Sequence, residues 1–409
     1  MSCHAHTSRR SCLGGARRVF GAMIALALLL AAASPAGEIS MAEAQRRLKT
    51  EAEDANALFS LSFYFEAAGR PFSALRAIER AIELDGKVPG YHARYGQLLM
   101  ARRRIRESAA AYARAADMDP KTKSFRAAAA RALTACDMLE SAAASWKMLL
   151  DGSDVPREIL DAARQLEAVH RRMNDLAGAE DAWRTAHGKL KERGERLSAA
   201  GSASAVMIAR GAPERAVKFW AEVLAGEKEW GHRAEVTGRL LAAARTPSAK
   251  SAEMLEAAAK AWKALLDAAE SNSQRQRAAT GLAEARLAGG RAKEAVSALR
   301  PWLFAREWNH NFAAGNVLHR AYTATGDGEA RRKMWGEFIK RSHNYRERSA
   351  AVSRLASITD DPADLVALHL ATVNDYPKEV SARQELASAL AAEGKLLDAG
   401  GVELIRAIS

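Results

Sequence analysis

Residues 89–120 read PGYHARYGQLLMARRRIRESAAAYARAADMDP, and the same order of small and large side chains is repeated before and after them. A small residue recurs every 34 positions, at Ala74, Ser108 and Ala142. A large residue stands four positions after each of them, at Ile78, Tyr112 and Trp146. Side chains three or four positions apart share one face of a helix. Each copy therefore predicts two amphipathic helices, the second of which carries a bulky residue beside a small one.

The second helix of each copy keeps this pattern along most of the chain, with insertions of a few residues. Its bulky residues continue at Trp183, Trp220, Trp262, Leu299 and Trp335. The small residues before them are Ala179, Ala216, Ala258 and Ala295, whereas Arg331 precedes Trp335. A helix pair of this kind cannot bury its apolar stripe alone, so each pair must pack on the next. The sequence predicts an all-α solenoid of about ten helix pairs with these tryptophans in the core. The alternative is an exposed ladder of tryptophans that stack on sugar rings.

The pattern resembles the tetratricopeptide repeat, W-x2-L-G-x2-Y then A-x3-F then P, with a period of about 34 residues. In the copy that begins at Pro89, these positions are His92, Tyr95, Gly96, Leu99, Ser108, Tyr112, Ala115 and Pro120. The resemblance is regular over residues 55–156, as three repeats, and divergent over residues 157–409. It implies a right-handed superhelix of helix pairs. Its concave groove, lined by the first helix of each pair, would hold peptides or proteins.

The resemblance also assigns groove positions. They are Asn56, Phe59 and Phe63 in the first repeat, Ala93 and Gln97 in the second, and Ala127 and Arg131 in the third. The family's subgroup that clamps the acidic C-termini of chaperones uses Lys, Asn and Arg here, and this set does not match. A more apolar groove suits a helix or an extended segment. We take Phe59, Phe63, Gln97 and Arg131 as candidate partner-binding residues.

The N-terminus has the layout of a secretory signal peptide, residues 1–36. Two arginine pairs, Arg9-Arg10 and Arg17-Arg18, precede an apolar run from Val19 to Ala33, and small residues follow up to Ala36. The apolar run is shorter than the roughly 20 residues that a membrane-spanning helix needs, so we expect cleavage and no transmembrane span afterwards. A periplasmic or secreted protein is predicted. We favour the general secretory route over the twin-arginine route. Residues 37–54 then form a capping helix or a loose lead-in.

Charge and cysteine content restrict the partners. The formal net charge is +12, and the signal holds four arginines and no acids, which leaves 57 basic against 49 acidic residues, or +8. This surplus allows attraction to acidic polymers, although an exported chain is not expected to meet nucleic acid. Of the three cysteines only Cys136 lies after the signal, so neither an intrachain disulfide nor a cysteine-based metal site is expected.

No catalytic, cofactor or metal motif is found. The eight histidines after the signal are scattered, without H-E-x-x-H or comparable ligand spacing, and no G-x-S-x-G or phosphate-binding glycine motif occurs. We therefore expect a protein that is not an enzyme.

Two local stretches are candidates for binding. Residues 300–312, RPWLFAREWNHNF, gather Trp302, Phe304, Trp308 and Phe312 around a proline. Aromatic and arginine-rich loops concentrate binding energy, but aromatics also fill irregular joins between repeats. The densest basic run, residues 102–106, RRRIR, falls on the turn between the two helices of its repeat. It is either a solvated turn or a contact for an acidic polymer or partner.

Taken together, these features predict a non-enzymatic periplasmic scaffold that brings proteins of the cell envelope together. The combination of an export signal with many divergent repeats is similar to the layout of periplasmic scaffolds of exopolysaccharide export. The alternative function is an acidic-polysaccharide-binding module.

Overall fold

A computed structural model describes residues 40–50, 54–304, 312–342, 344–359, 361–392 and 394 of the chain. These residues form helices joined by turns and loops, and no strand occurs among them. The predicted all-α solenoid is confirmed, because each helix packs mainly on its neighbours in the sequence. The chain divides into two compact units, unit 1 (residues 1–206) and unit 2 (residues 207–409). The predicted signal peptide lies outside the described residues.

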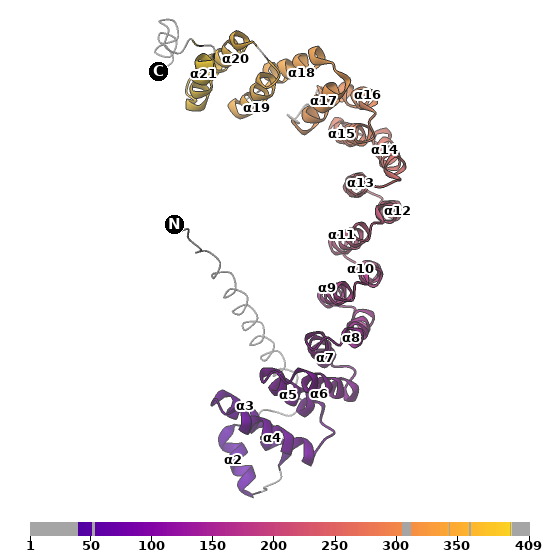
Figure 1. The fold of residues 1–409 in the computed structure, drawn as a ribbon, viewed down its shortest axis with the longest axis vertical. Helices are drawn as coiled ribbons and strands as arrows, with labels where there is room; N and C mark the ends of the chain where they lie inside the picture. The colour runs from indigo at the N-terminus through magenta and orange to yellow at the C-terminus, as the bar shows by residue number, and fades with distance from the viewer. Residues whose placement is uncertain are drawn as a thin grey trace, which may run out of the picture. The chain divides into compact units, whose positions relative to one another are not determined.

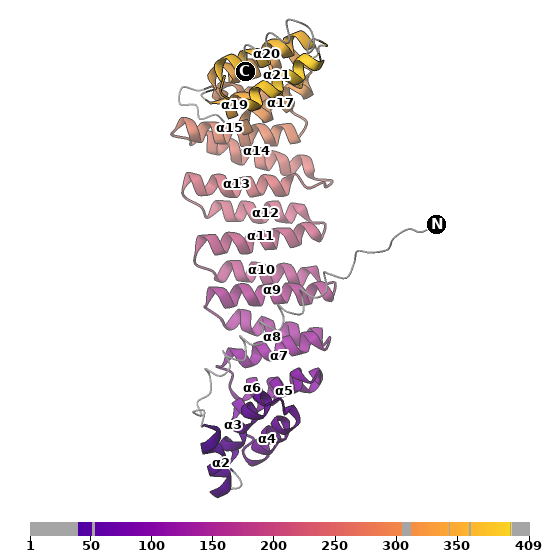
Figure 2. The same cartoon turned by 90° about the vertical axis from the view of Figure 1, so that its left-hand side faces the viewer.

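Unit 1 is a series of antiparallel helices in chain order (Figure 1). Its helices are α2 (Met41–Thr50), α3 (Ala55–Ala67), α4 (Pro71–Leu84), α5 (Pro89–Ala101), α6 (Ile105–Met118), α7 (Lys123–Ala135), α8 (Leu139–Gly152), α9 (Pro156–Arg172), α10 (Leu176–Lys189) and most of α11 (Arg193–Ala209). Every consecutive pair from α2 to α10 is in contact. Figure 2 shows α7, α8, α9 and α10 lying side by side.

The small and large residues of the repeat meet where the sequence pattern predicts. A Cβ atom at Gly96 of α5 would lie 2.9 Å from Cδ2 of Tyr112 in α6, so only glycine lets the two helices approach this closely. The Ser108 hydroxyl of α6 donates a hydrogen bond to the carbonyl of Gly96, with an oxygen–oxygen distance of 2.7 Å. Ala74, Ser108 and Ala142 are all fully buried. The small residues therefore set the helix spacing, and the large ones fill what remains.

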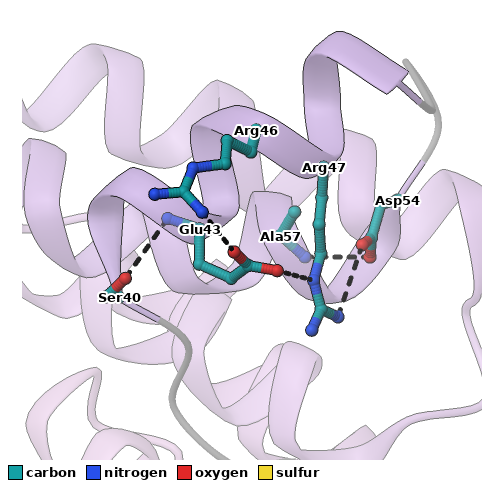
Figure 3. Close-up of polar contacts among 6 residues, drawn as sticks. All are labelled: Ser40, Glu43, Arg46, Arg47, Asp54 and Ala57. Carbon is teal, nitrogen blue, oxygen red and sulfur yellow. Dashed lines mark hydrogen bonds and ion pairs between the residues drawn. The ribbon is translucent and has the colours of Figure 1, made fainter.

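Helix α2 covers the outer side of the first pair, in the part of the chain predicted as a capping helix or lead-in. Its Ala44 packs on Ala57 and Leu61 of α3. The connection is held by a chain of polar contacts (Figure 3). Arg47 pairs with Glu43 at 3.1 Å and reaches Asp54 at 3.9 Å, and Asp54 caps α3 by accepting a hydrogen bond from the Ala57 amide at 3.0 Å. An aspartate at this position satisfies one of the amides that a helix start leaves unpaired.

Unit 2 continues the alternation of first and second helices. After the end of α11 it contains α12 (Pro213–Ala225), α13 (Trp230–Ala244), α14 (Ser251–Asp267), α15 (Asn272–Ala288), α16 (Ala292–Leu303), α17 (Phe312–Thr325), α18 (Gly328–Arg341), α19 (Tyr345–Ala356), α20 (Pro362–Asp375) and α21 (Val380–Ala392). Consecutive helices from α12 to α21 are in contact. Helix α21 begins the last predicted pair, whose second helix lies outside the described residues.

The tryptophan series belongs to the core in both units, as predicted. The exposed fractions are at most 5% for Trp146, Trp183, Trp220, Trp262 and Trp335. The clearest case is Trp262 of α14, whose ring lies between two glycines. A Cβ at Gly281 of α15 would be 2.3 Å from its Cε2 atom, and a Cβ at Gly238 of α13 would be 4.0 Å from its Cζ2 atom. These rings are therefore not available as a ladder for sugars.

Candidate partner-binding surfaces

The groove position predicted at Phe59 is in the core of unit 1. Phe59 is 4% exposed, and its ring centroid lies 5.1 Å from those of Tyr91 and Phe63. Phe63 is half-buried and meets Phe59 edge-on. Phe63 thus reaches the surface at this position, whereas Phe59 supports it from below.

A buried arginine, which the sequence pattern did not single out, organises the face beside Phe63. Arg94 of α5 is 3% exposed, and its guanidinium carbon lies 3.8 Å from the centroid of the Phe63 ring. It donates hydrogen bonds to the Ser62 hydroxyl at 3.1 Å and the Ser62 carbonyl at 3.0 Å, and it pairs with Glu66 at 2.8 Å. Burial lowers the pKa of Arg94, and the Glu66 carboxylate opposes that shift. The feature of the sequence that could have identified Arg94 is an arginine in an otherwise apolar stretch, opposite the polar Ser62 and Glu66 of the preceding repeat.

The other two groove candidates are engaged by neighbouring side chains. The Gln97 side-chain oxygen accepts a hydrogen bond from Arg94 at 2.9 Å. Arg131 of α7 is exposed, with Asp161 at 3.9 Å and the Trp146 ring centroid at 5.7 Å. Phe63, Gln97 and Arg131 lie on the first helices of successive pairs, so they share one side of the repeats. Their role in binding a partner stays a prediction.

The aromatic segment of residues 300–312 divides into two parts. Phe304 and Phe312 both pack on Phe338 of α18, each with a centroid distance of 5.3 Å, and they border the core of unit 2. They fill the join between α16 and α17, in agreement with the alternative interpretation of this segment. Trp308 lies outside the described residues.

Trp302, by contrast, lines an open depression of about 500 Å³ in unit 2. Helix α16 contributes Trp302, α14 contributes Leu266 and α15 contributes Leu282, which together give an apolar floor. Lysines stand at the rim on both sides, Lys263 from α14 and Lys293 from α16. The two rim helices are the second helices of successive pairs, so the depression follows from the repeat itself.

Both basic and acidic groups surround this depression, with a small excess of basic ones. Arg275 lies over the Trp302 ring, with its guanidinium carbon 5.8 Å from the centroid. Arg286 at the edge is neutralised by Glu256 at 2.8 Å and Glu294 at 3.3 Å, and Lys263 pairs with Asp267. Lys293 is exposed and forms no ion pair with any residue in the described part of the chain. A ligand with a negative charge and an apolar group would find complementary contacts here.

The geometry of the pairs agrees with the repeat pattern of the sequence. In the second repeat a glycine on the first helix lies against the aromatic residue of the second helix, and the fully buried small residue recurs at 34-residue intervals. The helix pairs have the packing of tetratricopeptide repeats. Phe63 lies on a first helix, α3, whereas Trp302 lies on a second helix, α16.

A scan against models of protein families and a search of curated proteins found no match. Among solved structures, the chain is similar to a chain of the Naa15/Naa10 complex bound to HypK-THB, with 18% identity, a TM-score of 0.38, and coverage of 90% of this chain and 60% of that chain. It is also similar to YrrB, described as a TPR protein with an unusual peptide-binding site, with 11% identity, a TM-score of 0.35, and coverage of 50% and 97%. A third, PilF of Pseudomonas aeruginosa, has 15% identity, a TM-score of 0.29, and coverage of 54% and 95%. At TM-scores this low, none of these similarities supports an argument about function. The proposed function therefore rests on the geometry of this chain.

Two observations on the described residues bear on other function classes. No group of three or more His, Cys, Asp or Glu side chains is placed to hold a metal ion in the described part of the chain. None of the described helices has the length and apolar character needed to cross a bilayer.

Proposed function

We propose that this chain is a non-enzymatic scaffold that binds other proteins of the cell envelope. The observation that carries the proposal is the depression around Trp302, where apolar side chains lie beside Arg275 and the exposed Lys293 on a stack of tetratricopeptide-type helix pairs. Tryptophan and arginine are enriched among the residues that dominate binding energy in protein interfaces. The envelope location rests on the signal peptide predicted from residues 1–36. A role around exopolysaccharide export rests on the likeness of layout alone.

The chemistry of the depression indicates what a partner must present. Leu266, Leu282 and the Trp302 ring favour an apolar side chain, since burial of apolar surface drives association. Lys293, which is exposed and forms no ion pair in the described part of the chain, favours an acidic residue beside that side chain. Because rim charges are exposed to water, they contribute more to the rate and specificity of association than to affinity.

An acidic polysaccharide is the second candidate, since the same site offers an aromatic ring and basic groups. The salt dependence of binding distinguishes a polysaccharide ligand from a protein partner. A polymer held mainly by exposed charges should dissociate as the salt concentration rises, because counterions screen such contacts. A protein held by an apolar anchor should stay bound.

The test is affinity capture from envelope extract with the full chain, followed by washing at low and at high salt. Wild type should retain one or more proteins at high salt, and the double variant Trp302→Ser and Lys293→Glu should lose them. The matched control is Lys333→Glu, which makes the same charge change at an exposed position of α18. Capture of sugar without protein, or equal capture by wild type and the double variant, would reject the scaffold proposal at this site.

A further inference from the structure

Most turns that follow the first helix of a pair share one backbone feature, a residue with positive φ. These residues are Gly69, Arg103, Asp137 and Asn174 in unit 1, and Gly211, Gly290, Gly326 and Gly394 in unit 2, whereas the turn between α13 and α14, which the structure describes in full, has none. Glycine adopts this left-handed conformation without strain, and asparagine and aspartate tolerate it. Arginine is the exception, with φ of 61° at Arg103. In this conformation the Cβ of Arg103 lies too close to the following carbonyl oxygen, and glycine, which has no Cβ, would not have this contact.

A strained residue of this kind is a pointer to function when the surroundings supply a reason for it. The reason here is a dense group of arginines with one exposed aromatic ring. Phe72, in the first turn of α4, is 68% exposed, and the guanidinium carbon of Arg102 lies 3.5 Å from its ring centroid. Arg103 and Arg106 are exposed on the next turn. Arg70 and Arg76 flank Phe72 on either side and are also exposed.

Most of these charges are not neutralised within the protein. In the described residues, Arg70, Arg76, Arg103 and Arg106 form no ion pair, whereas Arg104 is paired with Glu107. We call the surface formed by Arg70, Phe72, Arg76, Arg102, Arg103 and Arg106 the arginine edge.

The arginine edge ends one repeat later. At the position equivalent to Arg103 stands Asp137, whose carboxylate is 76% exposed and pairs with Arg172 at 2.6 Å. An extended anionic surface, such as a membrane or a long polymer, would gain no net positive charge from this ion pair as it followed the row of turns. A short ligand confined to the turns of the first two pairs would not.

We propose that the arginine edge binds a short acidic segment of a partner protein, with an apolar side chain of that segment placed on Phe72. The basic residues of this edge are all arginines, with no lysine among them. The planar guanidinium group matches a carboxylate through two parallel hydrogen bonds, and the Arg102 guanidinium already lies over the Phe72 ring. This surface lies in unit 1, on two turns and the beginnings of the helices that follow them, and it is independent of the Trp302 depression.

Arg103 makes the proposal testable, because stability and binding should respond in opposite directions. In Arg103→Gly the left-handed turn gains its preferred residue, so the unfolding temperature should stay the same or rise. Binding should weaken about fivefold, as expected for one exposed charged contact. In Arg103→Ala the strain remains while the charge is lost, so binding should weaken equally without the gain in stability.

The probe is a fluorescein-labelled peptide in which glutamates alternate with leucines, and binding to the full chain is measured by fluorescence anisotropy at low salt. The control peptide has glutamine at each glutamate position and should not bind. Combining Arg102→Gln, Arg103→Gly and Arg106→Gln should weaken binding about a hundredfold. Arg157→Gln, in the first turn of α9 at the other end of the helix pairs, removes one positive charge outside the arginine edge and should leave binding unchanged. Trp302→Ser should also leave it unchanged, so the two binding surfaces can fail separately.

Three results would overturn the proposal. The first is peptide binding that Arg103→Gly leaves intact. The second is that the chain binds vesicles of anionic lipid, or polygalacturonate, more tightly than it binds the peptide, and that this binding depends equally on the arginine edge. The third is a clear loss of stability in Arg103→Gly, which would show that the turn requires the arginine for folding.

Discussion

Replacing Gly281 by alanine should push helix α15 away from helix α14. The added Cβ would lie 2.3 Å from Cε2, 2.4 Å from Cδ2 and 2.7 Å from Cζ2 of Trp262. Carbon atoms in contact prefer a separation of about 3.5–4.0 Å. The Trp262 ring is 5% exposed and is enclosed by neighbouring helices, so the backbone of α15 has to move.

Two effects of opposite sign decide the size of the change. Overpacking of a core costs typically about 1–3 kcal/mol. Alanine in a helix interior is favoured over glycine by about 1 kcal/mol. The free energy of unfolding of Gly281→Ala should therefore fall by up to about 2 kcal/mol.

Gly238 provides a matched control on the other side of the same ring. It lies in the interior of α13, and a Cβ there would be 4.0 Å from the nearest atom of Trp262, an ordinary contact. Gly238→Ala should gain the helix preference without the clash and become more stable by up to about 1 kcal/mol. The difference between the two variants, about 1–3 kcal/mol, isolates the clash.

The assay is urea unfolding of the full chain followed by circular dichroism, with a thermal scan as a second measure. A unit of this size shifts its midpoint by about 2–4 °C for each kcal/mol. Adding Trp262→Leu to both variants should abolish the difference between their unfolding free energies, because the added Cβ clashes with the Trp262 ring. If Gly281→Ala and Gly238→Ala unfold at the same midpoint, Trp262 does not lie between the first helices of successive pairs, and this arrangement of α13, α14 and α15 is wrong.

Three further predictions concern unit 1. Ala142→Arg should lower the free energy of unfolding by about 1–3 kcal/mol or more, because Ala142 is fully buried between helix pairs. The control Ala144→Arg, at an exposed position of α8, should change it by no more than about 0.5 kcal/mol in the same unfolding assay. Glu66→Gln should lower the unfolding free energy by about 1 kcal/mol, since it leaves the buried Arg94 charge without its carboxylate, whereas Glu83→Gln in an exposed pair should have little effect. The pKa of Glu158 is lowered first by the hydrogen bond from the Ser153 hydroxyl and then by Lys123. The ionised carboxylate therefore stabilises the folded state above the usual glutamate pKa, and this stabilisation is lost as the pH falls. Glu158→Gln should make the unfolding midpoint less sensitive to pH between about 5 and 3.

The sequence was sufficient for the architecture, because the packing constraint repeats. A small residue followed four positions later by a large one predicts a buried contact, and Ala179, Ala216, Ala258 and Ala295 are all fully buried in the structure. Glycine also ends several first helices, and Gly69, Gly211, Gly290 and Gly326 have the left-handed conformation that this position favours.

The candidate binding surfaces were less predictable, because exposure depends on helix orientation and not only on repeat position. Phe59 and Phe63 are four residues apart on α3, yet the first is core and the second is half-exposed. Phe304 and Trp302 are two residues apart, and one fills a join while the other lines a depression. Arg94 was not predicted because its partners, Ser62 and Glu66, come from the preceding repeat. A period in the sequence gives the spacing of neighbours, but the rotation of each helix decides which side chains reach the surface.

Departures from the repeat are therefore more informative about function than the repeat itself. Positions that obey the pattern are explained by packing, which every pair must satisfy in order to stack. Arg331, at the small position before Trp335, is a departure that packing accommodates, since its guanidinium donates to the Thr323 hydroxyl at 2.9 Å beside a fully buried ring. Arg103 is a departure that packing does not explain, because its side chain is exposed and its backbone is strained. Local rules that a chain breaks without a structural gain point to functional sites, and by that reasoning the turn at Arg103, unlike the buried tryptophans of the repeat, points to a role other than folding.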